Sequence, residues 1–282
     1  MCMMENWKKL GNLNKKYLIS IKTITMKVEA LKSIIEKSSQ ILGGATGTAI
    51  SLISADPTVA SFINVGITPL LISSFNKIGT DLLSRRLSER ETAKIGSAYS
   101  FAVCRIDKNI KDGKTIRNDN FISEEKTNIN TEEIIEGVML KVQKEHELKK
   151  LEFYGNFLGN ISFYPEIDED YANLLLKIIE TLSYRQLCII AYFHKVGAIN
   201  LSKWQKHFEN NAIVIGQDLY VDMINLNNSN IIRRTPPYTV GALLGNSILS
   251  GIGNTIFKMM NLDEIKKQDI DSVEAEVKSL PS

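Results

Sequence analysis

The sequence predicts a mainly α protein, in which a helical bundle contains an apolar helical hairpin and is followed by a winged-helix-like unit with a short β-hairpin. Three observations predict this class. Apolar residues recur at helical spacing over much of the 282 residues, often behind helix-capping patterns. One long segment is almost free of charge, and two short strand-like runs surround Thr235-Pro236-Pro237.

The chain divides into five predicted segments. They are a basic N-terminal segment with an amphipathic helix, an apolar Gly/Ser-rich helical hairpin, a helical body, the winged-helix-like unit and a polar tail, at residues 1–37, 38–76, 77–182, 183–262 and 263–282. A composition that is 44% hydrophobic and 23% charged excludes a disordered or collagen-like chain. The net charge of +2 gives no global field that would mark a nucleic-acid binder.

Residues 38–76 are the most unusual part of the sequence. They contain one charged residue, Asp56, which together with Pro57 divides them into two pieces of about 18 residues, close to the length of a membrane-spanning helix. Gly43 and Gly47 form a small-xxx-small pair, a spacing that lets helices approach closely in lipid. The residues expected to carry insertion and packing are Gly43, Gly47, Asp56, Pro57, Ile63 and Phe75.

Both flanks of this segment are basic. Residues 1–40 contain eight Lys and three Glu, and Lys77, Arg85, Arg86 and Arg90 follow the segment. Such flanks are attracted to anionic lipid headgroups and would stay on the cytoplasmic side of a membrane. The alternatives are a buried helix pair in a soluble core, where Gly and Ser allow tight packing, and an interface with a partner.

The helical body is expected to begin with one long helix over residues 76–110, which Gly113 and a polar loop follow. Asn130 and Glu133 form a capping-box pattern that opens a second helix, running to about residue 158. Its inward side is expected to carry Ile134, Val138, Leu148, Leu151 and Phe157, and its solvated outer side Glu132, Glu133, Glu136, Glu145 and Glu147. After Pro165, Asp168 is expected to cap a helix with Leu174 and Leu175 on its apolar face.

The winged-helix-like unit is expected to begin at a second capping box, Ser183 with Gln186, on a helix that ends at Gly197. A short helix with Trp204 and a third helix over residues 216–227 follow. Residues 231–234 and 238–243 are the expected strands. The last helix is expected to carry Ile248, Ile252, Ile256 and Met259, and the tail beyond Leu262 is polar and expected to fray.

Catalytic motifs are missing from the sequence. His146, His194 and His207 fall on three different expected helices, and His146-Glu147 begins an HExxH pattern whose second histidine is replaced by Lys150. Cys2, Cys104 and Cys188 are too far apart for a zinc site or a disulfide framework and fit a reducing compartment. We therefore expect a protein that is not an enzyme and that uses neither a cofactor nor a metal.

Direct nucleic-acid contact is a lesser alternative for the winged-helix-like unit. Its candidate contacts are Lys203, Lys206, Arg233 and Arg234. The expected recognition helix contains Asp218 and Asp222 and no Lys or Arg, which is unfavourable for binding phosphates. Packing onto the helical body or onto a partner protein is the favoured role.

Two short patterns resemble a known family. They are Leu151-x-x-Tyr154-x-x-Phe157-Leu158-x-Asn160 and, after an apolar helix, Leu182-Ser183-x-x-Gln186-Leu187. Together they cover about 50 residues and resemble the Abi-alpha-like bacterial proteins, which are associated with abortive infection, the arrest or death of a cell that limits phage spread. The resemblance implies antiphage defence as the context and transfers no catalytic residue.

These observations lead to one functional hypothesis and one alternative. The hypothesis is an antiphage effector that stays soluble in the cytoplasm until a separate sensor or regulator protein triggers it. Residues 38–76 would then enter the inner membrane, bind anionic lipids, self-associate through Gly43 and Gly47, and depolarise the cell. The alternative is a non-enzymatic soluble adaptor that binds a partner protein, and in a lesser version DNA, through the winged-helix-like unit.

Overall fold

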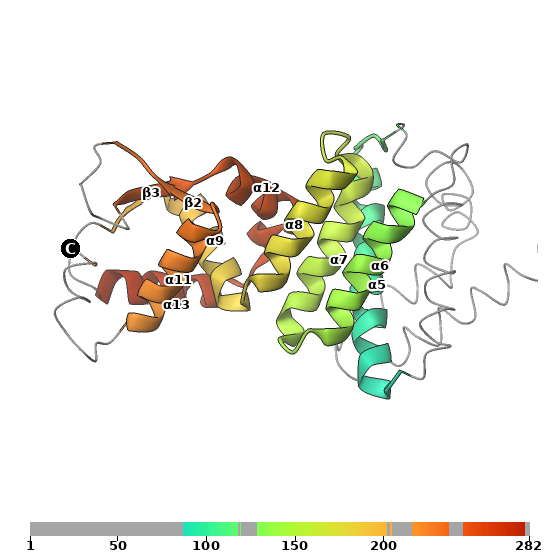
Figure 1. The fold of residues 1–282 in the computed structure, drawn as a ribbon, viewed down its shortest axis with the longest axis horizontal. Coiled ribbons are helices and arrows are strands. Elements are labelled where there is room, and N and C mark those ends of the chain that lie inside the picture. The colour runs from blue at the N-terminus through green and yellow to red at the C-terminus, as the bar shows by residue number, and fades with distance from the viewer. Residues whose placement is uncertain are drawn as a thin grey trace, which may run out of the picture.

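The computed structural model describes residues 87–117, 119, 129–201, 204, 216–236 and 245–279. Helices dominate these ranges, together with a small three-stranded antiparallel sheet, so the mainly α class is confirmed. Helices α5 to α8 lie together, and α9, α11, α13 and the sheet lie beyond them (Figure 1). The N-terminal segment at 1–37 and the apolar segment at 38–76 lie outside the described residues.

Helix α5 (Glu89–Lys111) begins later than the expected residue 76. A capping box sets its start, because the Ser88 N–H donates to Glu91 Oε2 (2.8 Å) and the Glu91 N–H donates to Ser88 Oγ (3.3 Å). The helix ends at Asp112, and Gly113 follows with a φ of +77°, a left-handed conformation that favours glycine.

The single helix expected from Asn130 to residue 158 is two helices in the structure. Helix α6 (Ile129–Lys144) already contains Asn130, so Asn130 is not its N-cap. Residues 145–147 are not helical, and a 3₁₀ turn (Leu148–Lys150) leads into α7 (Leu151–Asn160). The chain turns back at this break, so α7 packs against both α6 and α5 (Figure 1).

Helices α5 and α7 pack unusually closely along two glycines. A Cβ added to Gly155 would lie 2.5 Å from the Ala98 carbonyl oxygen, and one added to Gly159 would lie 2.7 Å from that of Ala102. Glycine and alanine at this spacing let the two backbones approach to a distance that larger side chains forbid. Around this contact the core is continuous, with Ile134, Val138, Leu151 and Phe157 buried as expected. Leu148 is 38% exposed and is therefore not an inward residue.

Two predicted helix starts are confirmed. Helix α8 (Glu169–Thr181) is capped by Asp168, whose carboxylate accepts the Tyr171 N–H at 2.8 Å. Helix α9 (Tyr184–Val196) begins with the Ser183–Gln186 capping box and ends at Gly197, where φ is +80°. Leu175 is buried on α8 as expected, whereas Leu174 is 45% exposed.

The small sheet has the strand order β1-β3-β2, with both pairings antiparallel. Strand β1 (Ala198–Asn200) follows α9 and was not predicted, while β2 (Ile232–Arg234) follows α11 (Gln217–Asn228) where the sequence placed it. The expected strand at 238–243 lies outside the described residues. Strand β3 (Asn246–Leu249) pairs with both neighbours, so Ile248 belongs to the sheet and not to the last helix.

Helix α12 (Gly251–Met260) joins the two halves of the molecule, because it packs against α7, α8 and α9. Its buried face includes Ile256 and Met259, as predicted. A 3₁₀ turn, η3 (Leu262–Glu264), follows it.

The prediction of a frayed polar tail at 263–282 is wrong for most of that segment. Residues Lys267–Ser279 form helix α13, which packs along α9 (Figure 1). The partners that hold this polar helix lie far away in the sequence, which is why composition alone did not predict it. Across the described ranges, no helix combines the length and the hydropathy that crossing a bilayer requires.

Candidate functional site

The structure describes few of the side chains that the sequence singled out for function. Gly43, Gly47, Asp56, Pro57, Ile63, Phe75, Lys203 and Lys206 all lie outside the described residues. Arg233 and Arg234 lie on β2, where Arg233 is exposed and Arg234 is half-buried. Successive side chains of a strand point to opposite faces, so these two arginines do not form one basic patch.

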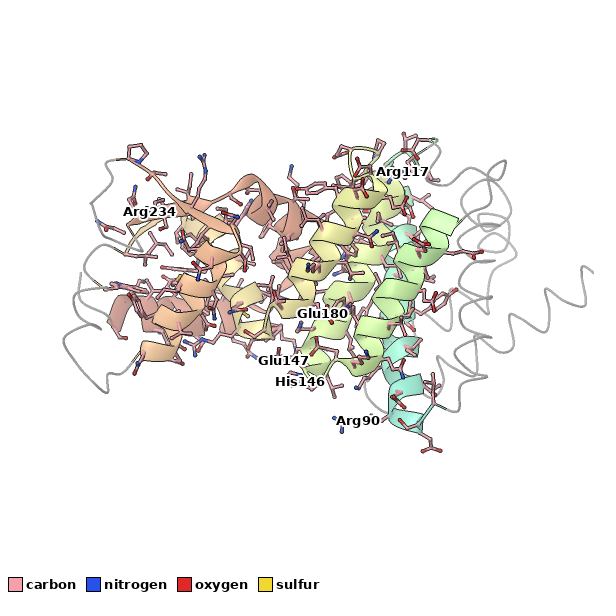
Figure 2. The ribbon with its side chains drawn as sticks, viewed as in Figure 1. Arg90, Arg117, His146, Glu147, Glu180 and Arg234 are labelled. Carbon is pink, nitrogen blue, oxygen red and sulfur yellow. The ribbon has the colours of Figure 1, made fainter. Side chains whose placement is uncertain are left out.

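A cleft lies at the break between α6 and α7, near the middle of the long axis of the described body, whereas Arg234 lies toward one end (Figure 2). Its volume is about 330 Å³. It is lined mainly by charged and polar residues of α6, the break and the start of α7, α8 and the turn before α9, among them Lys141, Glu145, His146, Glu147, Lys150 and Glu180. Lys141 and Glu180 form an ion pair of 2.5 Å between α6 and α8, which closes one side of the cleft.

The floor of the cleft is a buried ion pair. Lys150 Nζ lies 2.6 Å from Glu145 Oε2, and the two side chains are only 2% and 6% exposed. The expectation that Glu145 lies on a solvated helix face is therefore wrong. A buried lysine and a buried carboxylate compensate each other, which is the condition under which either is tolerated inside a protein.

The same carboxylate explains why the helix breaks. Glu145 Oε1 accepts the backbone N–H groups of His146 (2.9 Å) and Glu147 (3.0 Å), and this replaces helical hydrogen bonds with a local turn. Burial opposes ionisation of Glu145, but the hydrogen bonds from Lys150 and from these N–H groups outweigh it and hold the pKa of Glu145 below its ordinary value of 4.5. Glu145 is therefore a carboxylate at neutral pH.

Tyr154 completes this cluster from the first turns of α7. Its hydroxyl donates to Glu145 Oε2 at 3.4 Å, and its ring lies 5.5 Å from Lys150 Nζ. Burial and the neighbouring Glu145 raise the pKa of Tyr154 far above its ordinary value, so the hydroxyl stays protonated and acts as a donor.

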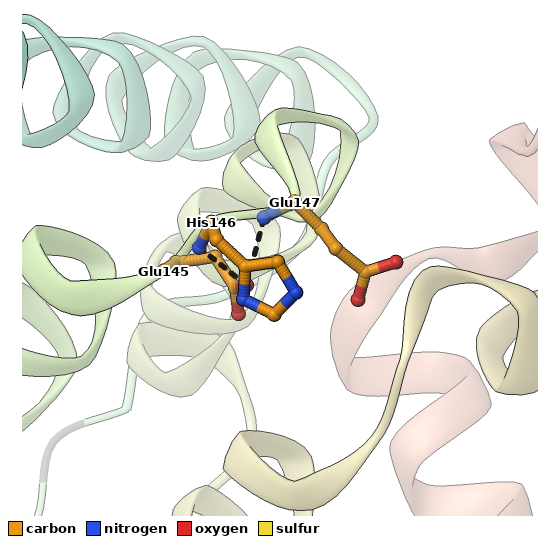
Figure 3. Close-up of side chains that lie close together, drawn as sticks. All are labelled: Glu145, His146 and Glu147. Carbon is orange, nitrogen blue, oxygen red and sulfur yellow. Dashed lines mark hydrogen bonds and ion pairs between the residues drawn. The ribbon is translucent and has the colours of Figure 1, made fainter.

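Glu145, His146 and Glu147 bring three metal-ligating groups together, within 4.8 Å of one another (Figure 3). Two of the three are already engaged, because both oxygens of Glu145 accept hydrogen bonds and Glu147 Oε2 accepts the Tyr184 N–H at 3.0 Å. His146 is 88% exposed, and in Figure 3 the Glu147 side chain points away from it. A metal ion would have to displace Lys150, so the arrangement fits a turn better than a metal centre.

A second polar cluster, which sequence reasoning missed, holds α7 against α12. Asn160 Nδ2 donates to the Met259 carbonyl oxygen (2.9 Å), and Asn156 Nδ2 donates to the Met260 carbonyl oxygen (3.2 Å). These are carbonyl groups at the C-terminal end of α12, which have no partner within that helix. Asn156 also accepts from Arg105 (3.1 Å), which pairs with Glu264. The repeated Gly-Asn dipeptides at 155–156 and 159–160 are the sequence signal that could have revealed it.

Arg117 is another charged residue with a structural role (Figure 2). Its buried guanidinium donates to the carbonyl oxygens of Ile161 (3.2 Å) and Ile167 (2.9 Å) and pairs with Asp119 (2.6 Å). The residue thereby fixes the connection between α7 and α8.

Cys104, Cys188 and His194, among the described residues, make packing or stacking contacts. Cys188 is buried and Cys104 half-buried, and burial raises the pKa of both thiols, to about 11 for Cys188. The His194 ring stacks on Phe257 with a centroid separation of 3.7 Å, and His207 lies outside the described residues.

No protein-family model matches the chain, and neither a curated protein nor a solved structure matches it.

Proposed function

We propose that this protein is a non-enzymatic effector of antiphage defence, in which residues 38–76 act on the inner membrane and the helical body anchors and regulates them. The observation that carries the proposal is the near absence of charge over these 39 residues, with Asp56 the single exception, between two basic flanks. The resemblance to Abi-alpha-like proteins supports the defence context.

The described residues support the anchoring role. Helix α5 begins shortly after the apolar segment, with Arg90 exposed in its first turn (Figure 2). It then packs along α7 through the glycine contact at Gly155 and Gly159. The buried charges Arg105, Arg117, Glu145 and Lys150 all have partners within the fold. Such a body would hold one end of the apolar segment fixed while the rest moves.

The test is the membrane potential of bacteria that express the protein, with the protein's cell fraction measured in parallel. Gly47→Arg and Ile63→Asp each place a charge in the apolar segment, which is expensive inside a bilayer, and should abolish depolarisation. Leu174→Asp is the matched control, because it adds a charge at an exposed apolar residue of α8 and should depolarise like wild type. Wild-type depolarisation by Gly47→Arg and Ile63→Asp would refute the membrane proposal.

The trigger is proposed to be a separate sensor or regulator protein that binds the C-terminal unit at 183–262. The element order α9-β1-α11-β2-β3 with the sheet order β1-β3-β2 is the specific observation that favours a winged-helix-like binding unit. The exposed residues of α11 are Gln217, Asp218, Val221, Asn225 and Asn228, and Val221 is 47% exposed. A surface with an exposed apolar residue, one acid and no Lys or Arg suits a protein better than nucleic acid.

Binding of DNA by the same unit is the competing candidate, and salt dependence separates the two. The affinity of a protein for DNA falls steeply as salt rises when it depends on contacts to phosphate. In a plot of the logarithm of the binding constant against the logarithm of the salt concentration, each such contact adds about 0.9 to the steepness of the slope. Replacing Lys203, Lys206 and Arg233 by Ala should lower that slope if the unit binds DNA, whereas Arg90→Ala should leave it unchanged. Retention on DNA that is equal for all variants would exclude these residues as contacts.

A further inference from the structure

Helix α13 is attached to the rest of the protein in an unusual way. Val273 is its one fully buried side chain, and Ile270 and Val277 are half-buried on the same stripe. By contrast, α9, which it covers, buries eight of its 13 residues. The spacing i, i+3 and i+7 is that of an amphipathic helix lying in a groove of another protein.

Charge pairs and a hydrogen bond also attach α13 to the rest of the protein. Asp269 accepts from Lys149 (3.2 Å) and from the Tyr184 hydroxyl (2.8 Å), and Glu274 pairs with Lys195 (2.8 Å). Glu276 pairs with Arg185 at 2.7 Å, and Arg185 also pairs with Asp218 and Asp222 of α11. In the pairs that α13 makes with the rest of the protein, α13 supplies the acids, and α9 or the turn before α7 supplies the cations. Partly exposed pairs of this kind contribute little stability and weaken as salt rises.

The surface beneath α13 is apolar and aromatic. Tyr184, Cys188 and Tyr192 follow one another at a spacing of four along α9, and Cys188 and Tyr192 are 3% and 6% exposed. The Tyr184 hydroxyl at the start of α9 donates to Asp269, and Lys195 near its end pairs with Glu274, so the side of α9 that carries Cys188 and Tyr192 runs along α13. Removal of α13 would expose this face between the cations Lys149, Arg185 and Lys195.

We propose that α9 carries a docking surface for the partner protein and that α13 covers this surface in the free protein. The partner binds there with an acidic amphipathic helix after displacing α13. The match between the acids of α13 and the cations around the α9 face defines the chemistry of the occupant. This inference builds on the proposed function, because it specifies where the sensor or regulator binds. The test of this inference measures only the binding of a helical peptide. A negative result can therefore be distinguished from a failure of the protein to depolarise cells.

The first measurement uses the full chain and a fluorescent synthetic peptide with the sequence of residues 266–280. Wild-type protein should bind the peptide weakly, because its own α13 fills the surface. Combining Asp269→Asn, Glu274→Gln and Glu276→Gln weakens the internal helix and keeps its apolar stripe, and should raise peptide affinity by about tenfold or more. Asp263→Asn, an exposed acid of η3, is the control and should not change the affinity.

The second measurement is the rate at which Cys188 reacts with a maleimide, in a background with Cys2→Ser and Cys104→Ser. The triple variant should react about tenfold faster than the background protein, and added peptide should restore protection, which it would not do for an unfolded chain. The background protein with an unaltered α13 should also react faster as salt rises from about 0.05 M to about 0.5 M.

Three results would overturn the proposal. The first is an unchanged peptide affinity in the triple variant. The second is a rate of Cys188 modification that responds neither to salt nor to the substitutions. The third is a protein mass in solution that doubles as protein concentration rises, together with loss of peptide binding. The last result would mean that α13 of a second copy is the natural occupant.

Discussion

Replacing Lys150 by methionine should destabilise the fold by about 3 kcal/mol. The side chain is 2% exposed and its ammonium lies 2.6 Å from the carboxylate of Glu145, which is itself 6% exposed. Removing one partner of a buried pair typically costs about 3–5 kcal/mol, because the other charge is left without compensation. Glu145 keeps the N–H groups of His146 and Glu147 and the Tyr154 hydroxyl, so we expect the lower end of that range.

The assay is urea unfolding followed by circular dichroism, with Lys149→Met as the matched control. Lys149 is the adjacent lysine, but it is 59% exposed and its pair with Asp269 should contribute at most about 1 kcal/mol. The double variant with Glu145→Gln and Lys150→Met removes both charges and should recover about 2 kcal/mol of the loss. Equal stability of Lys150→Met and Lys149→Met would refute the reasoning, because it would mean that the buried pair contributes no more than a surface pair.

Three further predictions concern packing, helix capping and pH. Gly155→Ala should destabilise the protein by about 1–3 kcal/mol, because its Cβ would lie 2.5 Å from the Ala98 carbonyl oxygen. Gly251→Ala, whose Cβ meets open space, should be neutral or slightly stabilising, and thermal melting of the two variants tests the contrast. Asn160→Ala should cost about 1–3 kcal/mol, because carbonyl groups at the end of α12 lose their donor, and an unchanged melting temperature would contradict this. The folded-state pKa of Glu145 lies below its ordinary value, so its ionisation stabilises the fold above about pH 4.5, and this contribution is lost as pH falls through the folded-state pKa. The urea midpoint, measured from neutral to acid pH, should fall less steeply for Glu145→Gln than for wild type. Parallel curves for the two proteins would exclude the Glu145 carboxylate as a source of acid instability.

The helix starts at Asp168 and Ser183 could be predicted because their signals are local. A capping side chain bonds to an N–H three residues away, so sequence spacing is enough to find it. The same pattern is present at Ser88 and Glu91, but the sequence analysis placed the helix start at residue 76, directly after the apolar segment.

The break at Glu145 could not be predicted from periodicity. Ile134 and Val138 share one face of a helix, but at about 100° per residue Leu151 and Phe157 fall on other faces of one continuous helix. Such a slip does not by itself distinguish a break from an irregular apolar face. The break depends on burying Lys150 beside Glu145, which requires α7 to have folded back. Helix α13 was missed for a similar reason, because Lys195 lies 79 residues away from its partner Glu274.

Of the candidate functional residues, sequence reasoning identified the apolar segment, which the described residues do not include, and two arginines of β2. It did not identify the cleft, because the break before α7 is brought together there with α6, α8 and the turn before α9. Charge pairing across such distances is a property of the folded chain, and a single sequence contains no direct record of it.

The alternation of glycine and asparagine along α7 has a consequence for how the chain can change in evolution. Gly155 and Gly159 face α5, while Asn156 and Asn160 face α12. Inserting or deleting one residue within this helix would rotate everything beyond it by about 100°. Both contacts would then be lost in a single event. The contacts with α5 and with α12 therefore each constrain the length of α7. Relatives of this protein should tolerate substitutions in α7 far more readily than a change in its number of residues.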